Sequence, residues 1–182
     1  MNEFLKMLVR AFDRLSGFGG LLAGIMMCLG VGMIACEIVL RSMFSMTLYV
    51  TEEYAGYLMA MLTFCALGFT LRERGHIRMT FLHRTVYGRA RIYLDMICYV
   101  VAFCFCLTLT YFTAIFFWDS VVSGSRSMQI SQSYLAIPQA FLPFGALIFT
   151  LQFLGEFLKS ILVLRGDTAG ITLKEDHGNL GR

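Results

Sequence analysis

The chain has 182 residues, of which 58% are apolar and 15% are charged, and its formal net charge is +3. A typical soluble domain is about half apolar, glycine included, and about a quarter charged. A soluble core of this size cannot hide so much apolar surface, because small domains leave much of their surface exposed. The composition therefore argues against a secreted soluble protein, a disordered tail and a nucleic-acid binder, and it favours a protein that crosses a bilayer.

Four long stretches contain no Asp, Glu, Lys or Arg, namely residues 15–36, 54–71, 96–118 and 127–155. A spanning helix needs about 20 mostly apolar residues, and in lipid only helices satisfy the backbone within each segment. We therefore predict an all-α integral membrane protein with four transmembrane helices in one membrane domain, residues 1–165. The predicted spans are at about 15–38, 54–73, 95–118 and 138–160.

Lys and Arg are distributed unevenly between the two sides of the predicted spans. The N-terminus, the connection after the second span and the C-terminal part hold 13 of them, whereas the other two connections hold only Arg41 and Arg126. The positive-inside rule then places both termini and the central loop in the cytoplasm. In that loop, Arg84, Arg89 and Arg91 are expected to meet anionic lipid headgroups. We expect a multi-pass protein of the bacterial inner membrane.

The two ends of the chain differ in character. Near the N-terminus, charged residues fall between apolar positions that share one helical face: Phe4, Leu5, Leu8, Ala11, Phe12 and Leu15. This pattern predicts an amphipathic helix start at the inner leaflet that continues into the first span. The C-terminal residues 166–182 combine glycines with scattered charges, which predicts a flexible cytoplasmic tail.

Polar residues and prolines mark the ends of two spans. Glu37 precedes Arg41 by one helical turn, and an acid followed by a base at this spacing supports a helix end. We interpret them as an ion pair at the outer headgroups. Near the start of the fourth span lie Pro138 and Pro143. Because proline breaks a helix interior but is tolerated in a first turn, either a short turn ends before Pro143 or a helix begins at Pro138 and kinks.

The groups needed for membrane catalysis are missing. All six cysteines fall inside predicted spans and form no C-x-x-C pair, so we interpret them as packing residues. The three histidines lie outside the spans, which leaves a haem without axial ligands. The middle of each span lacks the ionisable residue that an ion-coupled carrier usually keeps. We predict no catalytic, cofactor or metal site. A non-catalytic subunit is favoured over a membrane enzyme, and an autonomous small transporter acting as a homodimer remains the alternative.

Small residues recur every fourth position in two spans. The row in the first span is Ser16, Gly20, Gly24, Cys28, Gly32 and Cys36, and that in the third is Cys98, Ala102, Cys106, Thr110 and Ala114. Small residues let helices approach closely in lipid, where no hydrophobic force drives association. We expect contacts with helices of this chain or of a partner at Gly20, Gly24, Gly32, Ala102 and Cys106.

Several short motifs, taken in their order and spacing, resemble a known family. An acidic pair, Glu52 and Glu53, precedes the second span, Gly68 lies late in it, and Gly75-His76-Ile77 follows it. Arg41 matches a basic residue that closes the first span, and the segment with Pro138, Pro143 and Gly145 matches a proline-rich start of the last one. Over about residues 10–165 the chain resembles the small, Q-type membrane subunit of tripartite ATP-independent periplasmic (TRAP) transporters. It departs from the pattern at Thr80, where the family often has Asp.

The resemblance implies a division of labour. A soluble periplasmic binding protein captures an organic acid, and a large membrane subunit carries the substrate together with Na⁺. The small subunit packs beside the large one and supports docking of the binding protein, so no cofactor is expected in this chain. Candidate motif or partner-contact residues are Arg41, Glu52, Glu53, Gly68, Gly75, His76, Arg126, Pro138, Pro143 and Gly145.

The acidic pair has two interpretations. Acids at the start of a helix are favoured by its dipole, and this explains at least one of Glu52 and Glu53. Because adjacent helical residues point about 100° apart, one of the two can face a basic residue of a partner. We expect Glu53→Gln to weaken assembly with the large subunit or docking of the binding protein.

Overall fold

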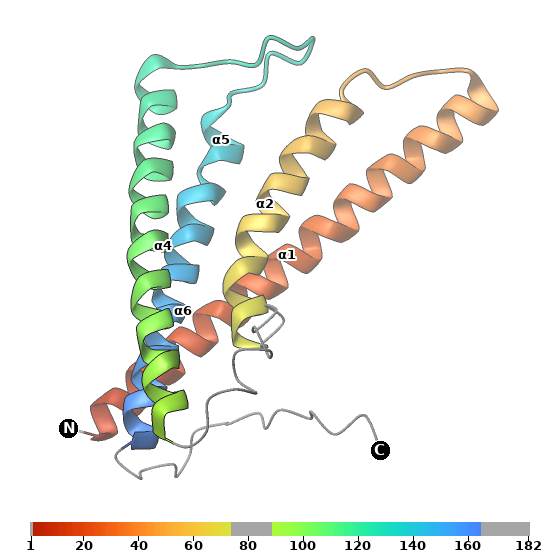
Figure 1. Cartoon of the computed structure of the whole chain (residues 1–182). Helices are drawn as coiled ribbons and strands as arrows, with labels where there is room; N and C mark the ends of the chain where they lie inside the picture. Colours follow the sequence, from red (N-terminus) through yellow and green to blue (C-terminus); the bar gives the residue numbers. More distant parts are fainter. Residues whose placement is uncertain (1, 74–88, 165–182) are drawn as a thin grey trace, which may run out of the picture.

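The computed structural model describes residues 2–73 and 89–164, and these residues form helices joined by short connections (Figure 1). The helices are α1 (Asn2–Phe44), α2 (Thr51–Arg72), α4 (Arg89–Ser123), α5 (Ala136–Gln139) and α6 (Phe141–Leu164). Four membrane-crossing segments, α1, α2, α4 and α5 with α6, are long and apolar enough to span a bilayer. No strand occurs in the described ranges, and the predicted all-α, four-span fold class is confirmed.

Helix α1 is longer than the predicted first span of residues 15–38. It runs without a break for 43 residues, which at 1.5 Å per residue is about 65 Å, roughly twice the thickness of the hydrocarbon. Figure 1 shows it crossing the other helices diagonally. The predicted helical start is confirmed as part of the same helix. Its first turns bury Lys6 and Val9 and expose Met7, so the buried positions are not those of the predicted apolar face, on which Ala11 is exposed.

The long helices have a definite order of neighbours. Helix α2 packs against α1 on one side and α6 on the other, while α4 packs chiefly on α6 (Figure 1). Helix α1 also crosses α6. The largest fully buried side chains of the described part lie on α1, α2 and α6, and include Ser16, Cys65 and Ile148.

The two prolines divide the last span into two helices. The short helix α5 ends at Gln139, and α6 begins at Phe141 with Pro143 in its first turn. The amides of a first helical turn have no partner inside the helix, so proline loses nothing there. Of the two alternatives, the short turn that ends before Pro143 is the correct one.

Glycines set the close approach of α2 and α6. A Cβ atom added to Gly145 would collide with the backbone carbonyl of Phe64, and one added to Gly68 would lie 2.7 Å from Cγ2 of Ile148. Only residues without a side chain fit at such distances. Gly68 and Gly145, which the family resemblance singled out, therefore have a packing role within this chain.

The row of small residues on α1 contacts its neighbours over only part of its length. A Cβ at Gly20 would lie 2.5 Å from the ring of Phe69, but Gly24 and Gly32 have no atom within 4 Å of such a Cβ. The contact expected at the last two positions is therefore not made by any residue that the structure describes. The physical reason is that four residues exceed one helical turn, so the row rotates by about 40° at each step.

The row on α4 lies partly against α6. Cys106 is buried, Ala102 is half-buried, and Thr110, one turn beyond Cys106, bonds Thr150 of α6 at 3.0 Å between their hydroxyl oxygens. Cys98 and Ala114 at the two ends of the row are exposed. On both helices a row spaced every four residues has a neighbour over only part of its length, which is the beginning of the row on α1 and its middle on α4.

Candidate functional site

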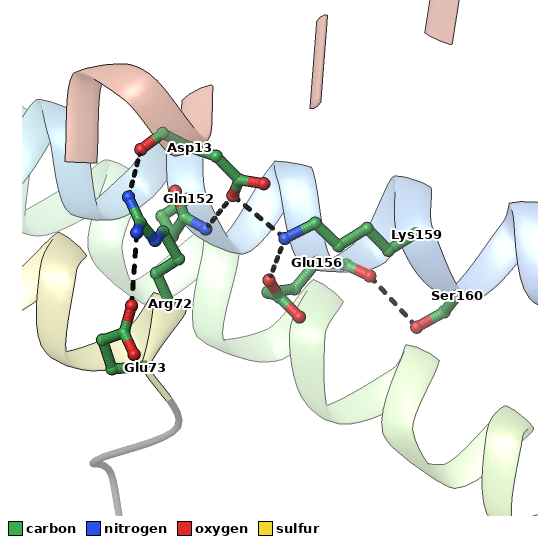
Figure 2. A network of polar contacts seen from close by, with 7 residues as sticks. All are labelled: Asp13, Arg72, Glu73, Gln152, Glu156, Lys159 and Ser160. Atoms are coloured by element: carbon green, nitrogen blue, oxygen red, sulfur yellow. Dashed lines mark hydrogen bonds and ion pairs between the residues drawn. The ribbon is translucent and has the colours of Figure 1, made fainter. Parts of the chain in front are cut away.

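A polar network joins three helices at the end of the bundle where α2 terminates (Figure 2). The carboxylate of Asp13 on α1 accepts hydrogen bonds through Oδ1 from Lys159 Nζ at 2.9 Å and from Gln152 Nε2 at 3.0 Å, both on α6. Lys159 also pairs with Glu156 Oε1 at 2.8 Å. From α2, Arg72 Nη1 donates to the backbone oxygen of Asp13 at 2.8 Å. One acid on α1 thus receives donors from both neighbouring helices.

Burial makes this network significant for stability. Lys159 is only 9% exposed and Gln152 is fully buried. A charge taken out of water is stable only when it is paired and hydrogen-bonded, and Lys159 has two carboxylates as partners. The side-chain oxygens of Gln152 and Ser16 are also buried, and neither accepts a hydrogen bond within the described ranges. The network fixes how α1 lies across α2 and α6.

At the opposite end of the bundle, Glu37 connects α1 to the start of α2. Its carboxylate pairs with Arg41 at 3.1 Å, which confirms the predicted ion pair. The other oxygen accepts the backbone amide of Leu48 at 2.9 Å and the hydroxyl of Thr51 at 3.2 Å. Because Thr51 is the first residue of α2, an acid from the preceding helix stands at a helix N-terminus, where negative charge is favoured. Sequence reasoning missed this second role of Glu37.

Glu53 faces hydroxyl groups of its own chain. Its carboxylate accepts hydrogen bonds from Tyr57 Oη at 2.7 Å, Ser131 Oγ at 2.5 Å and Ser133 Oγ at 2.8 Å. Glu52 beside it is exposed. The expectation that Glu53 meets a basic residue of a partner therefore needs revision, since its oxygens are already engaged within the chain. The acid that is open to a partner is Glu52.

The serines that bind Glu53 belong to a hairpin, residues 125–135, between α4 and α5. Its two arms are joined by backbone hydrogen bonds from Ser127 to Ser133 at 2.9 Å and from Leu135 to Ser125 at 3.1 Å. Arg126 forms an isolated bridge with Tyr134 and is exposed. The hairpin is therefore fixed both by its own backbone and by Glu53.

Of the other site residues predicted from the sequence, some lie in the described part of the chain and some outside it. Pro138 is buried in α5 and Pro143 is half-buried in α6. Gly75, His76 and Arg84 lie outside the described residues, as does the C-terminal segment 166–182, and Arg89 and Arg91 are placed only as part of the backbone of α4. Within the described ranges, no group of three or more His, Cys, Asp and Glu side chains is arranged to hold a metal ion.

Four helices that are long and apolar enough to cross a bilayer, with polar networks at both ends of the bundle, define a multi-pass membrane protein. The family model for the DctQ component of tripartite ATP-independent periplasmic transporters matches residues 30–162. The chain belongs to this family, and it is a small membrane component of a TRAP transporter. The family resemblance of the sequence is thereby confirmed. No curated protein and no solved structure matches the chain significantly.

Proposed function

We propose that this chain is the non-catalytic scaffold subunit of a Na⁺-driven, binding-protein-dependent TRAP transporter for organic acids in the bacterial inner membrane. It packs beside the large transport subunit and supports docking of the periplasmic binding protein. Membership of the DctQ family supports this function, because the family supplies one component of a tripartite transporter.

The observation that carries the proposal is where the ionisable groups lie. In the described residues, Asp13, Glu156 and Lys159 bind one another at one end of the bundle, and Glu37 and Glu53 bind groups of the same chain at the other. Between these ends the helices carry no Asp, Glu, Lys or Arg. Ion-coupled carriers typically keep such a residue within the membrane. The Na⁺ and substrate sites accordingly belong to the large subunit.

The outer half of α1 is the face that we assign to the large subunit. Its exposed side includes Gly24 and Gly32, and small residues at a membrane interface let another helix approach closely. The outer half of α1 also exposes large aliphatic side chains, such as Leu29 and Val31. The large side chains that α4 exposes include aromatic ones, among them Phe105, Phe112 and Trp118. Large apolar and aromatic side chains suit lipid and its headgroup region, so α4 is the lipid-facing side of the subunit.

Reconstitution tests the proposed function. The chain is co-expressed with the large subunit and the binding protein encoded by neighbouring genes, purified, and placed in proteoliposomes with a Na⁺ gradient. We expect uptake of an organic acid only when all three components and the gradient are present, and none with this chain alone. Uptake by the chain alone, purified as a dimer, would overturn the scaffold function in favour of an autonomous transporter.

A further inference from the structure

The tip of the hairpin, residues 125–135, exposes two apolar side chains outside the membrane spans. Met128 and Ile130 have relative exposures of 107% and 77%. The flanking spans end at Ser123 and begin again at Ala136, so the tip lies beyond the helices on both sides. In Figure 1 it stands at the end of the molecule farthest from the two termini. Unlike the exposed apolar residues of the spans, these two side chains belong to a connection outside the helices that are long enough to cross a bilayer.

The hairpin is held in one position before any partner arrives. Two backbone hydrogen bonds join its arms, and the Glu53 carboxylate on α2 accepts the hydroxyls of Ser131 and Ser133 next to the tip. Tyr57, one turn along α2, bonds the same carboxylate. A loop ordered in advance loses little conformational entropy on binding. Such support is expected of a contact surface.

The composition of the hairpin favours a protein over lipid as the group that covers the tip. The two apolar residues alternate with polar ones, Ser127, Gln129 and Ser131. Irregular backbone and polar side chains of this kind are not tolerated in hydrocarbon, where their hydrogen-bonding groups would lose water. An apolar centre surrounded by polar and charged groups is instead the usual composition of a protein interface. Arg126, exposed at the base of the hairpin, adds a cation to this rim.

We propose that Met128 and Ile130 form a docking contact for the soluble binding protein of the transporter, and that Glu53 is the positioning residue that holds the hairpin for it. This inference rests on the proposed function, in which such a protein delivers the substrate. The tip enters an apolar depression on the binding protein, and acidic residues beside that depression face Arg126. Because the tip is at the end opposite the charged network of Asp13 and Lys159, docking and the anchoring of α1 use different surfaces.

The test measures uptake by the reconstituted three-component transporter as the concentration of its binding protein is varied. We expect the double variant Met128→Ser/Ile130→Ser to raise the concentration for half-maximal uptake at least tenfold, with the rate at saturation unchanged. Met46→Ser/Tyr49→Ser is the matched control, because it makes two like changes at exposed apolar residues of the connection between α1 and α2, outside the hairpin, and it should leave the concentration unchanged. Co-purification of the variants with the large subunit shows that the membrane complex is intact.

Each other outcome has a definite meaning. An unchanged half-maximal concentration in the double variant, as a tip resting on lipid or on a second copy would give, overturns the docking contact but leaves the scaffold function standing. Loss of the large subunit on purification of the double variant assigns the tip to that subunit and also overturns the inference. Absence of uptake by the wild-type complex instead contradicts the proposed function itself.

The positioning role of Glu53 has a separate readout. Glu53→Ala should raise the half-maximal concentration in the same direction, and Ser131→Ala/Ser133→Ala should reproduce its effect. Combined with Met128→Ser/Ile130→Ser, Glu53→Ala should add little, because a displaced hairpin matters only when its tip makes the contact. Full additivity of the two effects would show that Glu53 acts through something other than the tip.

Discussion

Gly145 lies where α6 meets the backbone of α2, and the carbonyl of Phe64 occupies the space that a side chain would need. Family motifs in membrane subunits invite a functional interpretation, and for Gly145 and Gly68 the contacts within the chain are sufficient to explain the residue type. By contrast, the exposed acid Glu52 and the exposed cation Arg126 have no such explanation from packing. At this scale, burial separates residues that build the subunit from those available to a partner.

Gly145→Ala should lower the stability of the purified subunit. In an unobstructed helix interior, Ala is favoured over Gly by about 1 kcal/mol, but here the added methyl group meets backbone and not a movable side chain. Overpacking of this kind costs about 1–3 kcal/mol. Thermal unfolding in detergent, followed by circular dichroism, measures the change. Gly56→Ala on α2, where nothing lies within 4 Å of the new atom, is the control. Equal midpoints for the two variants would mean that α2 and α6 do not touch at Gly145.

Lys159→Met should destabilise the bundle by about 3 kcal/mol, because it leaves the half-buried carboxylates of Asp13 and Glu156 without their shared cation. The triple variant should recover much of the lost free energy of unfolding, since no charge in the network then remains unpaired. Its substitutions are Lys159→Met, Asp13→Asn and Glu156→Gln. Chemical unfolding of the purified subunit provides the comparison. Arg41→Gln breaks an ion pair whose arginine is largely exposed and should cost less than about 1 kcal/mol. A similar cost for Lys159→Met and Arg41→Gln would contradict the burial argument.

At the scale of whole helices, α1 differs from the others because its two halves have different surroundings. The inner half packs against α2 and α6 through Ser16 and Gly20, whereas much of the outer half is exposed apart from its contact with α2. In a subunit that worked alone, this face of small residues would lie against lipid, and the small residues would add no packing contact. A neighbouring helix does make more packing contact there, because its backbone can approach closely.

Gly24→Leu should therefore separate folding from assembly. A Cβ atom added at Gly24 meets no atom of the described residues within 4 Å, so the unfolding midpoint of the isolated subunit should stay unchanged. Assembly with the large subunit should weaken, because the leucine fills the space for the approaching helix. The recovery of large subunit on a tagged small subunit measures this, and Leu22→Phe, off the row, is the control that should be tolerated. Wild-type recovery with Gly24→Leu would remove α1 as the assembly face.

Part of this architecture was predictable from the sequence. Features set by residues close together in the chain were predictable, and contacts between residues far apart in the chain were not. The four spans follow from charge-free stretches because bilayer thickness fixes their length. The pair of Glu37 and Arg41 follows from helical spacing over four residues. The bond from Lys159 to Asp13 joins residues 146 positions apart, and that from Ser131 to Glu53 joins residues 78 apart. No local pattern reveals such contacts, since they depend on how α1 crosses α6 and where the hairpin lies.

For the whole molecule, the orientation in the membrane is a prediction that rests on charge alone. Reporter fusions after residues 45 and 125 should report the periplasm, and those after residues 80 and 175 the cytoplasm, because 13 of the 15 Lys and Arg residues lie on the second side. A fusion after residue 125 that reported the cytoplasm would contradict both the orientation and the docking contact proposed for the hairpin. Fusions at all four positions distinguish an inverted subunit from one with a different number of crossings.

The unbroken length of α1 makes it a lever. A continuous helix bends little, so a displacement of its outer end rotates the whole helix. The rotation takes place about the point where α1 crosses α2 most closely, at Gly19 and Gly20. From Gly20 the outer arm to Phe44 is about 36 Å long and the inner arm to Asp13 about 10 Å, at 1.5 Å per residue. A partner that tilts the outer arm therefore moves Asp13 in the opposite direction, by about a quarter of the distance. The force would act on both ties of the helix, namely the bonds of Glu37 to the start of α2 at the outer end and the hydrogen bonds of Asp13 to α6 at the inner end.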